Sequence, residues 1–280
     1  MLEGKLEELK IKTETYYAIQ KLRIQAQLRI QAFVRDGRLN EVQAGSLHFW
    51  LHEHLLNFEK ILKKDIAGLI KGVPVWEGWL KKVKGIGPCL GGSLYAGIVD
   101  ISKFQYVSSL WAYCGLDVRG GEAPRRQRGE KINWSPFLRM TMYKVTDSFV
   151  KQDPDKCLYR RLYDEKKAYY QEKFPEYKIC NKCGESLLVR PGKPDKCSKK
   201  GCKGTQGGII HPMRKTNKGD PMFIHTKDHL HKMAKRYAGK IFLQHLWVEW
   251  RKIMGLSVSQ PWIIAHGGHD HYIEPDQPTI

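Results

Sequence analysis

Two long segments with helical periodicity open the chain. Apolar residues recur at spacings of three, four or seven over residues 6–33 and again over residues 47–69, which places them on one face of a helix. Gly37 follows the first segment as a C-terminal cap, and the polar connection after it is short enough to join two antiparallel helices. The pattern predicts a helical hairpin over residues 1–72, which either packs on its own domain or forms a coiled-coil dimer with another copy.

The apolar pattern is next interrupted by a glycine bend. Residues 80–88 read Leu-Lys-Lys-Val-Lys-Gly-Ile-Gly-Pro, and small residues follow up to Gly97. Glycines allow a tight bend, and the N–H groups at the start of a following helix suit a phosphate, so the segment is typical of a helix-hairpin-helix. A corner that binds nothing is the alternative. The residues assigned to phosphate contact are Lys82, Lys84, Gly85, Ile86 and Gly87.

Helical periodicity returns in the second half of the chain. Pro136 precedes apolar residues at helical spacing, a charged helix is expected from Leu158 towards Phe174, and a long helix is expected within residues 225–254. The fold class is therefore predicted to be mainly α. The domains that we expect are a helical hairpin at 1–72, a helix-hairpin-helix domain at 73–175, an inserted segment at 176–212, a C-terminal helix completing the core at 213–256, and a tail at 257–280.

The charge of the chain points to a polyanionic partner. The sequence holds 48 Lys and Arg against 29 Asp and Glu, a formal charge of +19, and such a chain gains by releasing counterions from phosphates. Residues 1–80 hold 12 basic and 10 acidic side chains, so the nucleic-acid surface is expected after residue 80. A loop at 118–131 is rich in glycine and arginine, and guanidinium groups bind phosphates bidentately, although a solvated loop is the alternative. Its assigned residues are Arg125, Arg126 and Arg128.

A membrane surface is the competing partner for a basic chain. No apolar run approaches the roughly 18 residues of a membrane span, and the first residues lack the apolar core of a signal peptide. Seven cysteines, an odd number, fit a reducing compartment better than a disulfide framework. We therefore expect a cytoplasmic protein with no membrane partner.

Four cysteines give the strongest chemical signal in the sequence. Two tight pairs are separated by 13 residues rich in lysine and glycine, a segment too small to build a core without a metal. Four thiolates suit tetrahedral Zn²⁺ in a closed, structural site, so we predict a zinc ribbon, with a metal-free loop or disulfides as the alternative. The nearby lysines predict either phosphate contact or a solubilising surface. The predicted ligands are Cys180, Cys183, Cys197 and Cys202.

Several short motifs occur in an order that resembles a known family. They are Gly-Ile-Gly-Pro at 85–88, Asp-Ile-Ser-Lys-Phe at 100–104, Leu-Trp-Ala-Tyr-Cys-Gly-Leu at 110–116, the basic glycine loop, and Leu-Arg at 138–139. In this order they resemble the C-terminal domain of transposases of insertion sequences of the 110/116/902 type, a family that includes the Piv-like DNA invertases. The resemblance covers about residues 40–175 and 225–255, and the zinc segment departs from it. It implies DNA or a structured guide RNA as partner, homo-oligomers formed through the N-terminal helices, and a prokaryotic or viral mobile element as context.

The resemblance also implies parts that this sequence does not show. Family members carry an N-terminal RuvC-like domain with an acidic tetrad, and they carry a serine in the basic loop. Here no Asp-bearing strand precedes the hairpin, and no serine lies between Asp117 and Asn133. Ser135 follows the loop but does not align with the nucleophile, so no residue is assigned a catalytic role.

Three functional hypotheses of different class remain. The chain is a nucleic-acid-binding protein that is not catalytic alone. Alternatively, it is a transposase or recombinase subunit that acts with a separately encoded RuvC-like nuclease. A third possibility is a non-catalytic interaction protein that regulates a transposase through its coiled coil.

Overall fold

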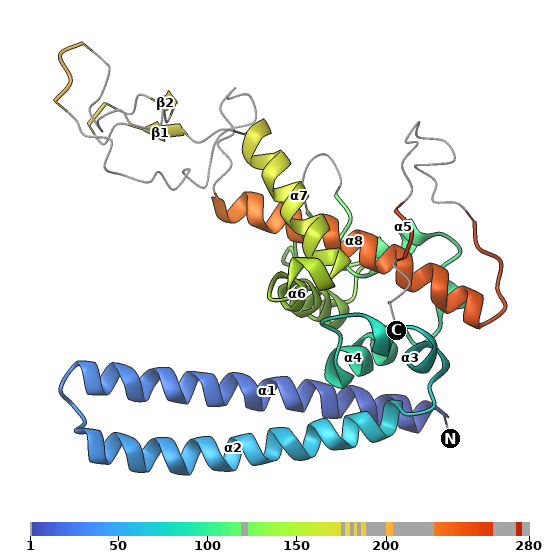
Figure 1. Cartoon of the computed structure of the whole chain (residues 1–280), viewed down its shortest axis with the longest axis horizontal. Helices are drawn as coiled ribbons and strands as arrows, with labels where there is room; N and C mark the ends of the chain where they lie inside the picture. The colour runs from blue at the N-terminus through green and yellow to red at the C-terminus, as the bar shows by residue number, and fades with distance from the viewer. Residues whose placement is uncertain are drawn as a thin grey trace.

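The computed structural model describes residues 2–118, 123–174, 177–179, 182–183, 186–188, 200–203, 227–259 and 273–275. In these residues, a long helix pair runs along one side of a group of shorter helices (Figure 1). The prediction of a mainly α fold with an N-terminal helical hairpin is confirmed.

The N-terminal pair is an antiparallel hairpin. Asn40 starts the second helix with a capping box, because its side chain accepts from the N–H of Gln43 at 2.8 Å and its own N–H donates to the Gln43 side chain at 3.2 Å. Arg23 and Glu59 join the two helices through an ion pair with an Nε–Oε1 distance of 2.6 Å. The helices are α1 (Leu2–Arg35) and α2 (Glu41–Ile70).

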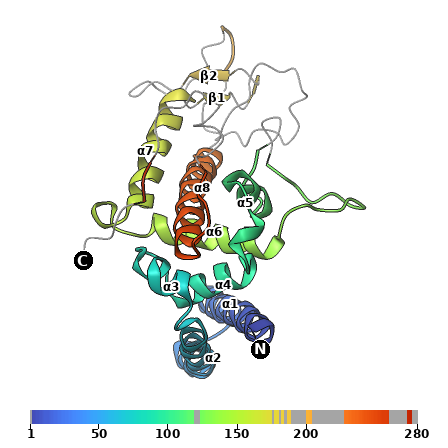
Figure 2. The ribbon, with the colours of Figure 1, turned by 90° about the vertical axis from the view of Figure 1, so that its right-hand side faces the viewer.

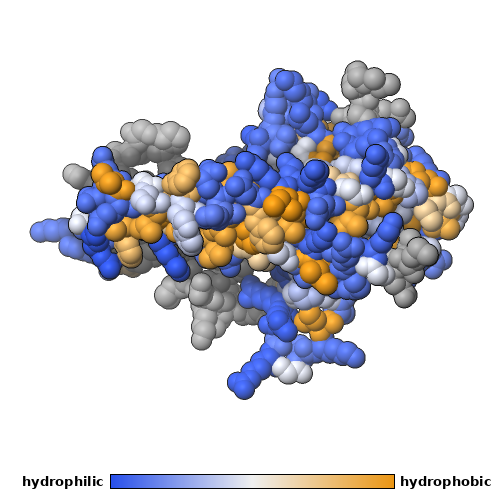
Figure 3. Space-filling model, turned by 90° about the horizontal axis from the view of Figure 1, so that it is seen from below, coloured by the Kyte–Doolittle hydropathy of each residue, from blue (hydrophilic) through white to orange (hydrophobic). Residues whose placement is uncertain are grey.

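Among the described residues, the shorter helices cover only one end of this hairpin. Leu9 and Ile66 pack against Cys89 and Ala96 of the helix above them. Farther along, apolar residues of the predicted stripes stay 37 to 51 % exposed, namely Leu22, Phe33, Leu47 and Phe58. Figure 3 shows apolar residues along the length of the hairpin among hydrophilic ones. The sequence periodicity therefore predicted the helices correctly, and much of the apolar face that it indicated is exposed in the described structure.

The shorter helices form a core in which residues far apart in sequence meet. Leu94, Leu138 and Phe242 are each fully buried and come from three different helices. The helices are α3 (Pro74–Gly78), α4 (Pro88–Ile98), α5 (Val107–Tyr113), α6 (Pro136–Val150), α7 (Leu158–Lys173) and α8 (Lys227–Ile253). Short 3₁₀ turns lie between them at η1 (Leu80–Lys82), η2 (Ile101–Lys103) and η3 (Pro154–Lys156).

The small residues of α4 are required by close packing on several sides. A Cβ added to Gly91 would lie 2.5 Å from the ring of Trp76, and one added to Gly97 would lie 2.5 Å from Leu138. Helix α4 lies between the hairpin on one side and α6 on the other (Figures 1 and 2). The small-residue run therefore permits close helix packing.

We call the group of shorter helices the helical body. Within it, helix α8 is joined by hydrogen bonds to residues far away in sequence. Trp247 donates from Nε1 to the carbonyl of Phe104 at 2.7 Å, and Tyr159 and His245 share a buried hydrogen bond of 2.9 Å. Trp111 donates from Nε1 to the carbonyl of Lys240 at 2.9 Å. These bonds pair aromatic side chains with α8 across more than 80 residues of sequence, so α5 and α7 depend on α8 for their positions.

The segment predicted to be a zinc ribbon is described only in part. Two short strands pair antiparallel with Tyr177 opposite Leu188. Cys180 and Cys197 lie outside the described residues, so the ribbon stays a prediction. Most of the predicted tail at 257–280 also lies outside them. The strands are β1 (Tyr177–Ile179) and β2 (Ser186–Leu188).

Candidate nucleic-acid interface

The glycine bend is a tight corner supported by α6. Gly85 has a φ of +93°, and Gly87 is the N-cap of α4. Ser148 donates from Oγ to the carbonyl of Gly85 at 2.7 Å. A Cβ on Gly85 would lie 3.2 to 3.3 Å from Ser148, Phe149 and Gln152. Both the backbone conformation and the crowding by α6 therefore require glycine at this position.

Of the two residues after Gly85, one is buried and the other is exposed. Ile86 is 6 % exposed within the central core, and its N–H donates to the carbonyl of Val83. Gly87 is exposed, and nothing lies within 4 Å of the position that a Cβ would take. Ile86 therefore anchors the bend. The open side is at Gly87, where the first-turn N–H groups of α4 have no acceptor within the helix.

A hollow with several lysines opens beside Gly87. Lys144 lies with Nζ 3.1 Å from the ring centroid of Tyr17, and burial lowers the pKa of Lys144 to about 8. Lys82 and Lys84, predicted from the sequence, are exposed next to the bend. The lysines that line the hollow are Lys63 from α2 and Lys144 and Lys151 from α6.

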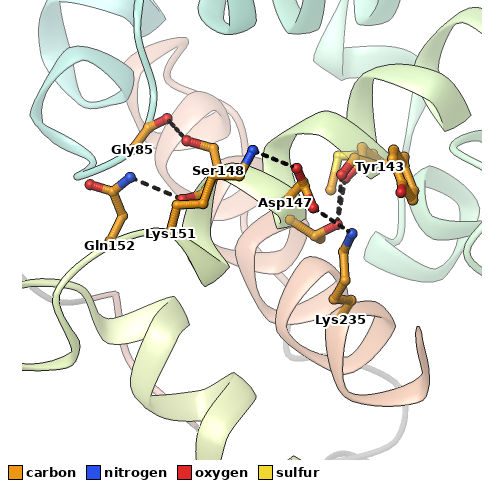
Figure 4. A network of polar contacts seen from close by, with 9 residues as sticks. Gly85, Tyr143, Asp147, Ser148, Lys151, Gln152 and Lys235 are labelled. Carbon is orange, nitrogen blue, oxygen red and sulfur yellow. Dashed lines mark hydrogen bonds and ion pairs between the residues drawn. The ribbon is translucent and has the colours of Figure 1, made fainter. Parts of the chain in front are cut away.

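One carboxylate in the hollow is neutralised by the protein itself. Asp147 pairs with Lys151 at 2.9 Å and with the buried Lys235 of α8 at 3.2 Å (Figure 4). Burial raises the pKa of Asp147, but the hydrogen bonds and charges of these two lysines outweigh burial and lower it. Asp147 therefore stays ionised at neutral pH. In the described chain neither Lys63 nor Lys144 has an ion pair, so their charges remain available to an anion.

The basic loop extends away from the helices at the other end of α6 (Figure 2). Arg139 fixes its start by donating from Nη1 to the carbonyl of Pro124 at 2.6 Å, while its guanidinium carbon lies 4.6 Å from the ring centroid of Trp134. Trp134, in turn, lines a hollow of about 290 Å³ formed by the loop. The loop arginines Arg125, Arg126 and Arg128 are exposed.

The structure does not bring the bend and the loop together at one point. The loop enters α6 at Pro136, whereas the bend rests on Ser148 and Gln152 near its other end. Twelve residues of helix at about 1.5 Å each separate these points by about 18 Å. The two predicted phosphate sites thus lie one helix length apart, a spacing that one nucleic-acid backbone can follow across several nucleotides.

Sequence reasoning missed the lysines that α2 and α6 contribute to the bend. Lys63 lies 24 residues before Gly87, and Lys144 lies 57 residues after it. Neither belongs to a local motif, and only the packing of α2 and α6 around α4 places them there. A tertiary contact map would have been needed to find them.

Ser135 and the buried cysteines have structural surroundings. Ser135 caps α6 by accepting from the N–H of Leu138 at 3.2 Å, and its own N–H donates to the carbonyl of Tyr113. Burial raises the pKa of Cys89 to about 11 and also raises that of Cys157. Those two thiols are therefore held protonated at neutral pH, which disfavours a role as nucleophile.

Two of the four predicted zinc ligands lie within the described residues. Cys183 and Cys202 line one hollow together with Lys182, Lys200 and Lys203. Strand β1 ends immediately before Cys180, and β2 starts three residues after Cys183. Cys183 thus lies between the two strands in sequence.

Residues 78–159 match the family model described as Transposase IS116/IS110/IS902 family. The match includes the glycine bend, the basic loop and α6, and it supports a DNA-related transposase function for this region. It is narrower than the resemblance seen in the sequence and leaves out the hairpin and α8. A comparison with curated proteins found no match. No described helix combines the length and the apolar character that a membrane crossing requires.

Proposed function

We propose that this chain is a DNA-binding protein related to transposases that contacts backbone phosphates at the glycine bend and at the basic loop, and that it does not cut DNA alone. The first contact uses Gly87 and the N–H groups after it. The second uses the loop arginines. The residues proposed for these contacts are Lys82, Lys84, Gly85, Gly87, Arg125, Arg126 and Arg128, with Ile86 as the anchor of the bend.

The observation that supports this proposal best is the open N-terminus of α4 beside Lys63 and Lys144. Oriented N–H groups and the helix dipole favour an anion at Gly87, and these two lysines add positive charge that no described carboxylate pairs with. Exposed lysines alone would be a weak argument, because a basic surface is often only solvated. The combination with a fixed, glycine-dependent corner and the family match favours a phosphate ligand.

A salt-dependence measurement tests the proposal. We expect wild-type protein to bind a 30-base-pair duplex, and its binding constant to fall steeply with salt because each contacted phosphate releases about 0.9 counterion. Replacing Arg125, Arg126 and Arg128 by glutamine should reduce the slope of log K against log salt by up to about three. Absence of binding even at low salt would refute the proposal.

A matched control and an RNA arm sharpen the measurement. Gln replacement of Lys60, Lys64 and Lys21 on the hairpin removes the same charge from exposed positions far from the loop, and its slope should change little. A structured RNA hairpin, tested beside the duplex, decides whether RNA is the better partner. Tighter binding of RNA at equal salt would replace DNA as the primary ligand.

Structural zinc is proposed for the segment that carries the four cysteines. The two described cysteines border one hollow, and the hairpin of β1 and β2 is the element that a zinc ribbon contains. We expect one zinc per chain by metal analysis. Cys183→Ser should lose the metal, whereas Cys89→Ala, at a buried cysteine elsewhere, should keep it. Well under one zinc per wild-type chain would end this part of the proposal.

A second candidate function, protein interaction through the hairpin, is favoured by its exposed apolar face. Leu28 is 59 % exposed and Trp50 is 60 % exposed. A second copy of the chain is the occupant that we propose, because the hairpin is nearly neutral and long helices with exposed apolar stripes pair as coiled coils. Light scattering should give a dimer mass. Leu28→Glu should yield monomers, while the control Gln25→Glu should not.

The family match also keeps a recombinase subunit as a candidate. Residues 78–159 match the model of a transposase family, and the basic surfaces of this region would hold DNA for a nuclease supplied by another chain. Joint purification with a RuvC-like nuclease encoded beside it should then give strand exchange that neither chain gives alone. If the mixture gives none, the binding role without catalysis is retained.

A further inference from the structure

Two basic side chains on α8 are partly withdrawn from water and form no ion pair with any other described residue. Arg236 and Lys240 are four residues apart, so they share one face of the helix. Both side chains are partly buried. In the described part of the chain, neither the guanidinium of Arg236 nor the ammonium of Lys240 has a hydrogen bond or an ion pair. Burying a charge without a partner is costly, so this arrangement requires an explanation.

The surroundings of the two side chains add positive charge. Burial lowers the pKa of Arg236, and the nearby Arg139 lowers it further. Burial also lowers the pKa of Lys240, and Arg236 adds to that effect. Asp117 is the carboxylate that acts on both in the opposite direction. Among the described residues, the cluster thus holds three cations near one carboxylate, so positive charge is in excess there.

Aromatic rings contact two of the three cations. Lys240 lies with Nζ 5.1 Å from the ring centroid of Trp111, which is held by its own hydrogen bond to the Lys240 carbonyl. Arg139 lies over Trp134 at 4.6 Å. Trp134 and Asp117 also line the hollow beneath the basic loop. Arg139 therefore lies beside that hollow, and Arg236 and Lys240 are close enough to Asp117 to interact with its charge.

We infer that Arg139, Arg236 and Lys240 form a phosphate site beside the basic loop, which receives a backbone phosphate of the nucleic acid bound by that loop. This inference rests on the proposed nucleic-acid function and extends it to α8, which the family match does not include. A phosphate supplies the negative charge that the cluster lacks. The planar guanidinium groups can each donate two hydrogen bonds to it.

The inference predicts that removing these cations weakens nucleic-acid binding but does not lower the stability of the unbound protein. If the cations only supported the fold, their removal would lower stability. If they await an anion, their removal relieves repulsion between like charges and leaves the unbound protein as stable or more stable. The same change should weaken nucleic-acid binding, because phosphate contacts are lost.

The test compares Arg236→Gln/Lys240→Gln with Lys60→Gln/Lys64→Gln. Both double variants remove two positive charges at an i, i+4 spacing, but Lys60 and Lys64 are exposed on α2. For the α8 variant we expect a slope of log K against log salt reduced by up to about two and a melting temperature without ligand no lower than wild type. For the α2 variant the slope should change little. Equal slopes in the two variants, or a clear loss of melting temperature in the α8 variant, would overturn the inference.

Two further measurements complete the test: a charge-conserving variant and the effect of inorganic phosphate on the melting temperature. Arg236→Lys preserves the charge and should retain most of the salt slope that Arg236→Gln loses; equal loss in both would count against a phosphate contact. Inorganic phosphate, at ionic strength matched with chloride, should raise the melting temperature of wild type more than that of the α8 variant. If wild type shows this effect but binds no nucleic acid, the site takes free phosphate and the nucleic-acid assignment is overturned along with the proposed function. If nucleic acid binds and the α8 variant behaves as the control does, only the α8 site is refuted.

Discussion

The hairpin and the helical body differ in which apolar residues they expose and in which charged residues they pair. The hairpin of α1 and α2 leaves Phe49 and Trp50 mostly exposed but buries and pairs its inner charge, Glu59, with Arg23. The body buries many of its large apolar residues in one core and leaves Lys144, Arg236 and Lys240 without an ion pair among the described residues. Exposed apolar surface favours a protein partner, and positive charge without an ion pair favours a polyanionic partner. The two regions are therefore suited to two different kinds of partner.

Removing a large side chain from each region gives the sharpest contrast. Phe149 is fully buried and stacks on Tyr159 with ring centroids 4.6 Å apart, so Phe149→Ala should cost about 3–5 kcal/mol of unfolding free energy. Phe58 is 46 % exposed, and Phe58→Ala should cost under about 1 kcal/mol. Denaturant unfolding at one protein concentration measures both. Similar losses would show that the exposed face of the hairpin is covered in solution.

The pH dependence of binding tests the cations of the body. Lys144 has a pKa lowered to about 8 by burial, so raising the pH from 7 to 9 should neutralise it and weaken DNA binding by up to about tenfold, the value of one strong contact. Lys144→Gln should bind more weakly at pH 7 and lose this part of the pH dependence. The exposed control Lys60→Gln should keep it, and an unchanged profile in Lys144→Gln would exclude Lys144 as a contact.

The deprotonation of Lys144 that weakens DNA binding should increase the free energy of unfolding. Between pH 8 and the ordinary lysine pKa of 10.5, the unfolded chain binds a proton at Lys144 that the folded chain does not. Stability contributed by this residue therefore rises with pH across that window. Unfolding midpoints of wild type minus those of Lys144→Gln measure this contribution.

The smallest expected effect concerns the turn of the hairpin. Asn40 forms the capping box of α2, so Asn40→Ala should lower stability by about 1 kcal/mol, whereas Asn40→Gly should cost only a few tenths. Neither change touches the body, so DNA binding should be unaffected in both. A loss of binding in Asn40→Ala would indicate that the hairpin tip takes part in the nucleic-acid interface.

Local signals in the sequence were sufficient for the elements and for part of the site. Periodicity predicted α1, α2, α6 and α8, and the order of glycine, proline and lysine residues located the bend at Gly85 and Gly87. The exposure of the hairpin was not predictable in the same way, because periodicity shows which face is apolar and not whether anything covers it. The small-residue run of α4 was visible, yet its cause, contact with Trp76 and Leu138, was not.

By itself, the sequence determined the helical character of the chain, its excess of positive charge, the glycine corner and the cysteine pairs, because each depends on residues close together along the chain. Only the tertiary structure decided which charges meet. Asp147 neutralises Lys235 from another helix, while Lys144, Arg236 and Lys240 are brought to their sites without an ion pair in the described chain, and Asp117 is a carboxylate near both Arg236 and Lys240. Electrostatic interactions depend on distance in space and on burial, and neither is set until the helices pack.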